Sequence, residues 1–129
     1  MASILRVNTL TDASSNNSTA MSTIFNGTAK AWGQLNYSTG SFADSFNNSS
    51  ATDFQTGSFH HNFTNAFSNS SYSISGSHNL PSGNTCSILI GYDDSARFTT
   101  SSVNVAAFNV TNGRVDATRV CTKVMGDLA

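Results

Sequence analysis

The chain has 129 residues, and its seven acidic and six basic side chains give a formal net charge of -1. Ser, Thr and Asn supply 52 of the 129 residues and Glu is absent. Because these three residues compete with the backbone for hydrogen bonds, the composition excludes a helical bundle or a coiled coil. The near-neutral balance gives no electrostatic footprint for a nucleic-acid partner or an anionic membrane surface.

The first 28 residues are expected to form an extended arm outside the folded domain. Residues 2–10 alternate between apolar and polar side chains, whereas residues 11–28 are mostly polar and have no period. We expect this second stretch to stay unstructured until it meets a partner. The sequence lacks an apolar run suited to a secretory signal or a membrane span, which predicts synthesis in a cytosol and no membrane insertion. The apolar residues expected to make the attachment contacts are Leu5, Val7, Met21, Ile24 and Phe25.

Strand patterns begin at residue 29. The spacing of apolar residues between Ala31 and Phe46 predicts two strands joined by a turn at residues 38–40. Residues 58–64 alternate cleanly, which places Phe59, His61 and Phe63 on one face of a strand. The next expected elements are a short strand at 72–75, a loop over 76–84 with the only proline, and a strand over 86–92. A turn over 92–97 and a strand over 98–107 follow, and Asn112-Gly113 predicts a hairpin turn. The last expected strand covers 116–125, with Val120, Thr122 and Val124 on one face.

This succession of strands and turns predicts one fold class. Turn signals recur roughly every 8–12 residues, which is typical of sandwiches and jelly rolls. We therefore expect an all-β protein: an antiparallel, jelly-roll-like β-sandwich over residues 29–129 with an extended N-terminal arm over residues 1–28. Only 27 of the 129 residues are Val, Ile, Leu or Phe, so the core of one chain is thin. Association of copies would bury additional surface, and a homotrimer is the expected assembly.

Catalysis is poorly supported, and no cofactor is expected. Three His and no Glu leave few acid–base pairs, and no nucleophile lies in a recognisable motif. The nine glycines form no phosphate-binding loop. An enzyme acting on a cell-surface polysaccharide would need a carboxylate pair, for which the candidates are Asp93, Asp94 and Asp116.

Two pairs of residues raise the question of a metal site. His60 and His61 are adjacent on a predicted strand and point to opposite faces, so they cannot chelate one ion together. A core histidine is favoured for His61, with an interface contact or a metal ligand completed by a partner chain as alternatives. Asp93 and Asp94 could contribute to a calcium site, but a solvated turn is the favoured interpretation.

The two cysteines do not predict a metal cluster or a redox motif. Cys86 and Cys121 are too far apart in the chain for a CxxC motif, and two thiols do not make a zinc site. In a cytosol we expect both to stay reduced, as small strand residues.

Binding is better supported than catalysis. Amides, hydroxyls and aromatic rings on rigid strands suit uncharged polar ligands such as glycans. The candidate contact positions, expected to lie in loops, are His78, Asn79, Tyr92, Asp93 and Asp94. Ordinary solvated loop residues are the alternative interpretation of each.

An ordered series of short motifs resembles the short tail-fibre proteins of phages that infect cyanobacteria and other aquatic bacteria. The series begins with the opening MASILRVNTL. It continues with Lys30-Ala31-Trp32, with Asp44-Ser45-Phe46-Asn47, with Asn62-Phe63-Thr64-Asn65-Ala66, and with Gly126-Asp127. The similarity extends over nearly the whole chain. Two departures are Gly33-Gln34-Leu35 after Trp32, where the group has more apolar and aromatic residues, and His61 at a place that is usually apolar.

The resemblance implies a virion protein that forms a trimer, attaches to the tail through its first 25–30 residues and faces the sandwich outward. It brings no catalytic residues. The expected function is a tail fibre subunit that recognises a host-surface glycan, with other tail or baseplate proteins as partners. A capsid decoration or baseplate protein with a purely structural role is the alternative.

Overall fold

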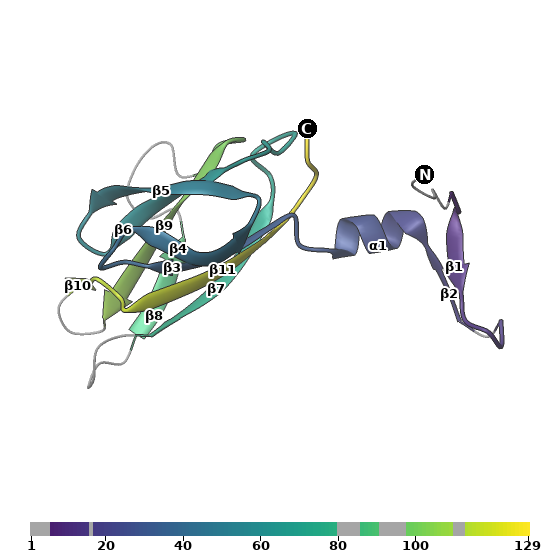
Figure 1. Cartoon of the computed structure of the whole chain (residues 1–129), viewed down its shortest axis with the longest axis horizontal. Helices are drawn as coiled ribbons and strands as arrows, with labels where there is room; N and C mark the ends of the chain where they lie inside the picture. Colours follow the sequence, from purple (N-terminus) through teal and green to yellow (C-terminus); the bar gives the residue numbers. More distant parts are fainter. Residues whose placement is uncertain (1–5, 16, 80–85, 91–97, 110–112) are drawn as a thin grey trace.

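Two antiparallel sheets lie face to face, and a short hairpin and helix project from one end of them (Figure 1). This computed structural model describes residues 6–15, 17–79, 86–90, 98–109 and 113–129, with the range 86–90 described in backbone only. The prediction of an all-β sandwich is confirmed.

The first sheet has four strands in the order β4-β3-β11-β7. In the second sheet β5, β6 and β9 are adjacent in that order, and β8 and β10 also pair with β9. The strands of the first sheet are β3 (Ala31–Asn36), β4 (Ser41–Phe46), β7 (Ser73–Asn79) and β11 (Arg119–Met125). Those of the second sheet are β5 (Asn48–Gln55), β6 (Ser58–Phe63), β8 (Cys86–Ile90), β9 (Ser102–Asn109) and β10 (Gly113–Arg114).

The core lies between the two sheets and follows the alternation of the strands. In β3 and β11 every second side chain is buried, because successive side chains of a strand point to opposite faces. The Tyr37 hydroxyl donates a hydrogen bond to the carbonyl oxygen of Val105 at 3.0 Å and so links one sheet to the other. The large buried residues of the core are Leu35, Tyr37, Phe59, Phe63, Phe67, Tyr72, Val103, Val105, Val120 and Val124.

Strand β9 is buried on both of its faces. Val103 and Val105 point into the core, while Asn104 and Ala106 on the opposite face are also fully buried. The Asn104 side chain satisfies its polar atoms through Ser58, with its Nδ2 donating to Ser58 Oγ at 3.0 Å. The outer face of the second sheet is therefore closed at its centre.

In the first sheet, by contrast, most of the outward side chains are exposed. We call this outward surface of β4-β3-β11-β7 the open face. The contrast between the two sheets follows from the sequence of the strands, because in β3 and β11 every second residue is polar or exposed.

Two predictions about the strands were wrong. The loop expected over residues 76–84 begins later, because β7 runs to Asn79, where it pairs with Arg119 of β11. Residues 76–79 include types that favour turns, so the sequence did not indicate a strand here. Their strand conformation is stabilised by pairing with β11. Strand β5 was not predicted, because it lies at a sheet edge, is mostly polar, and contains two register shifts that break its alternation.

Residues 11–28 were predicted to be unstructured, and the structure corrects this. They contribute to a hairpin of β1 (Thr9–Thr11) and β2 (Ser18–Ala20), followed by helix α1 (Met21–Gly27). Asp12 organises the turn: its carbonyl oxygen accepts from the Ser15 N–H at 3.0 Å, and its carboxylate accepts from Asn17 Nδ2 at 2.7 Å. A polar stretch without a period can thus fold locally when its side chains supply the turn's hydrogen bonds.

Candidate functional site

The open face presents an exposed aromatic pair among polar side chains. Trp32 of β3 and Phe46 of β4 are cross-strand partners, and 39% and 52% of their side-chain surfaces are exposed. Lys123 of β11 is the partner of Trp32 on the other side of β3. Large exposed aromatic residues on a sheet face favour a binding role, since such residues are otherwise buried.

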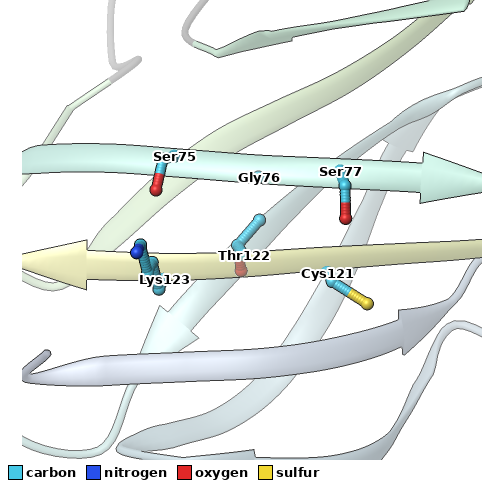
Figure 2. A pocket seen from close by; sticks show the side chains of 6 residues that line it. All are labelled: Ser75, Gly76, Ser77, Cys121, Thr122 and Lys123. Carbon is cyan, nitrogen blue, oxygen red and sulfur yellow. The ribbon is translucent and has the colours of Figure 1, made fainter.

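A shallow pocket of about 340 Å³ lies next to this pair, between β7 and β11. Figure 2 shows Ser75 and Ser77 on β7 beside Cys121 and Lys123 on β11. Gly76, between the two serines in the chain, pairs with the buried Thr122 and therefore faces the core side of the sheet. Lys123 therefore borders both the pocket and Trp32, so the aromatic pair and the pocket form one continuous surface.

Charged and amide side chains occupy the neighbouring positions of the open face. Asp44 of β4 is the cross-strand partner of Gln34. The Gln34 carboxamide oxygen, in the orientation that satisfies its hydrogen bonds, accepts from Arg119 Nε at 2.5 Å and Nη1 at 3.3 Å. Arg119 is in turn the partner of Asn79 in β7. The face thus offers two cations, one carboxylate, and several amides and hydroxyls.

The five predicted receptor contacts lie in different places. Asn79 is exposed on the open face, but in a strand and not in a loop. His78 was wrongly placed in a loop as well: it lies in β7, half-buried, and its Nε2 is buried without a partner in the described part of the chain. Burial lowers the pKa of His78 below its usual value of 6.5. Tyr92, Asp93 and Asp94 lie outside the described residues.

Apart from Asn79, the residues that form the open face were missed as a site by sequence reasoning. A signal was present in β3, where Ala31, Gly33 and Leu35 are buried and the much larger Trp32 has the opposite parity. A tryptophan out of phase with the buried residues of its strand is expected on the surface. The partners Ser75, Ser77 and Lys123 carry no comparable signal.

His61 is a core residue, as the favoured interpretation had it. Its side chain is 1% exposed, its Nδ1 lies 3.3 Å from Thr122 Oγ1, and the Phe42 ring meets it edge-on at 5.2 Å between centroids. Burial, and secondarily the charge of His60, lowers the pKa of His61 to about 3. Among the described residues no group of three His, Cys, Asp or Glu side chains is placed to hold a metal ion.

The structure also describes the surroundings of two other residues considered in the sequence analysis, Asp116 and Cys121. Asp116 accepts a hydrogen bond from the Gly57 backbone N–H at 2.6 Å, which gives its carboxylate a role in fixing a turn. Cys121 is half-buried on the open face and is a free thiol.

The N-terminal hairpin and helix expose the apolar residues predicted to make attachment contacts. Phe25 is 53% exposed, and Val7 and Met21 are 37% and 36% exposed. Ile24 is half-buried, and no residue of α1 is buried. Leu5 lies outside the described residues. Leu10, which the prediction did not include, is 45% exposed on β1.

Lys30 joins this N-terminal segment to the sandwich. Its side chain is 6% exposed, its ammonium donates to the carbonyl oxygen of Phe25 and to Thr28 Oγ1, and it lies 3.7 Å from the centroid of the Phe25 ring. Its backbone N–H donates to the Val124 carbonyl oxygen in β11 at 2.8 Å. The ammonium thus holds the C-terminal end of α1 where carbonyl groups lack helical partners.

Replacing Lys30 with methionine is expected to loosen α1 without unfolding the sandwich. The amides of α1 should lose about tenfold of their protection from hydrogen exchange, which corresponds to about 1.4 kcal/mol. Lys123→Met, a change at an exposed lysine of the sandwich, is the control and should leave this protection unchanged. Undiminished protection in the Lys30 variant would contradict the joining role of its ammonium.

No protein-family model matches the chain, and neither the curated proteins nor the solved structures include a significant match. The family resemblance therefore rests on the order of its motifs. The described part of the chain has no helix with the length and apolar character needed to cross a membrane.

Proposed function

We propose that the protein is a bacteriophage virion protein, a tail fibre subunit that attaches to the tail through residues 1–28 and presents its sandwich to a host-surface glycan. Its partners are two further copies of itself in a homotrimer and other tail or baseplate proteins, and its location is the virion tail after synthesis in the host cytoplasm. The motif series supports this proposal, and the open face supports its binding half.

The observation that carries the proposal is the exposed Trp32 and Phe46 pair on the same face as a pocket bordered by two serines and Lys123. Sugars have apolar C–H faces that stack on aromatic rings, and hydroxyls that hydrogen-bond to amides, serines and charged groups. The open face offers both kinds of contact within one rigid sheet. Two aromatic residues surrounded by polar side chains make a smaller apolar area than a stable protein interface needs, which favours a glycan as the occupant.

The N-terminal segment supports the attachment half. A two-stranded hairpin and a seven-residue helix are marginal by themselves in water. They expose Leu10, Met21 and Phe25 and bury none of their side chains. An element of this kind gains stability when a partner covers its apolar residues, as attachment to a tail would do.

Competition with intact phage tests the binding half. Purified protein in excess is expected to slow adsorption of its phage to host cells, and Trp32→Ala should weaken this competition about tenfold or more, since a central aromatic residue dominates such contacts. The matched control is Phe54→Ala, because Phe54 is 44% exposed but contacts His60 on the second sheet. Protein that is present in virions but leaves adsorption unchanged would instead be a decoration or baseplate protein.

A further inference from the structure

The open face has an excess of positive charge at the border of its pocket. Lys123 is exposed and forms no hydrogen bond or ion pair with the described residues. Arg119, four residues before it on the same face of β11, is exposed as well. Asp44, the one carboxylate of this face in the described residues, is on β4, beyond β3 from the pocket.

The pocket also offers neutral donors beside Lys123. Ser75 is the cross-strand partner of Lys123, and Ser77 is the partner of Cys121. Neither serine side chain hydrogen-bonds to the described residues. Thr122, in contrast, is buried, and its hydroxyl lies at His61 Nδ1. An ammonium and two serine hydroxyls around one small space suit a carboxylate, whose oxygens accept from all three.

We infer that the glycan bound at the open face contains acidic sugars whose carboxylate lies in the pocket at Lys123, with the neighbouring sugar ring stacked on Trp32. This inference rests on the proposed function and narrows its ligand to uronic-acid polysaccharides. Charge complementarity carries it: an unpaired ammonium at a surface raises the local concentration of anions, whereas a neutral glycan would leave that charge unused.

The test compares two polymers that differ only in charge. Full-length protein is titrated with polygalacturonate and with the same polymer after its carboxyl groups have been reduced to alcohols. The protein is expected to bind the acidic polymer at least about tenfold more tightly, and this preference should shrink as NaCl rises from about 50 mM to about 500 mM. Lys123→Met should remove the preference, and Lys123→Arg should retain most of it. Arg6→Met, at an exposed cation of the N-terminal segment, should leave it unchanged.

The outcomes separate this inference from the proposed function. Equal binding of both polymers, binding of neither, or a preference that Lys123→Met leaves intact would overturn the inference. The proposed function stands in each case if the protein still slows adsorption and Trp32→Ala weakens that effect. A change of subunit number in Trp32→Ala or Lys123→Met would identify the face as a subunit interface and overturn the inference as well.

Discussion

Acidification from pH 6.5 to about pH 4.5 is expected to lower the free energy of unfolding by about 2 kcal/mol. Burial lowers the pKa of His61 from 6.5 to about 3, because the enclosed ring cannot be hydrated as a cation. Well above pH 6.5 the ring is neutral in both states. As the pH falls below 6.5, the unfolded chain binds a proton that the folded chain does not, so each pH unit costs about 1.4 kcal/mol. Urea denaturation at a series of pH values measures this slope.

The matched variant for this prediction is His61→Leu combined with Thr122→Val. The second change removes the buried Thr122 hydroxyl, which would otherwise be left without its contact to His61 at 3.3 Å. The double variant is expected to keep a shallower slope, because His78 also has a pKa lowered by burial. A double variant whose stability falls as steeply with acid as the wild type would show that a group other than His61 is responsible.

Replacing Gly57 with alanine is expected to destabilise the sandwich by on the order of 3 kcal/mol or more. Gly57 has a φ of +70°, and a Cβ there would lie 2.6 Å from the Val115 backbone nitrogen and 2.8 Å from its oxygen. Val115 cannot easily move away, since its N–H donates to the Ala107 carbonyl oxygen at 3.0 Å. The Gly57 N–H is held by Asp116 on the same side. Thermal and urea unfolding both report the loss.

Gly113→Ala separates backbone strain from this clash. Gly113 has a φ of +83°, and nothing lies within 4 Å of the position of its Cβ. The change should therefore cost only about 1 kcal/mol, the penalty of a positive φ for a residue with a side chain. Equal losses in the two variants would mean that Val115 yields to the new methyl group and that the clash contributes nothing.

The strands that sequence reasoning placed correctly are those with large apolar residues at alternate positions. In β6 and β11 the inward residues Phe59, Phe63, Val120 and Val124 alternate with polar ones, so period and burial agree. Strand β5 and the second half of β7 lack such residues, and their conformation is fixed by the strands beside them. Local composition alone could not reveal that pairing.

The binding surface was less accessible to prediction than the fold. Sequence reasoning placed candidate contacts in loops, whereas the open face is made of strand residues brought together by register. Trp32, Lys123 and Ser75 are far apart in sequence and become neighbours only because β3 and β7 both pair with β11. The sequence alone could indicate that Trp32 faces outward, but which residues lie beside it depends on the order of the strands in the sheet.

The register shift in β4 divides that strand into two independent parts. Ala43 is the extra residue, since Asp44 pairs with Gln34 and Phe42 pairs with the next residue, Leu35. Phe42 consequently points inward, over Gly33 and against His61, while Phe46 points outward although it has the same parity. Evolution can therefore vary the positions after the bulge, and with them ligand preference, without disturbing core packing. Loss of the single residue Ala43 would remove the bulge and place Phe42 directly before Asp44, so ordinary alternation would keep Phe42 inward and Phe46 outward.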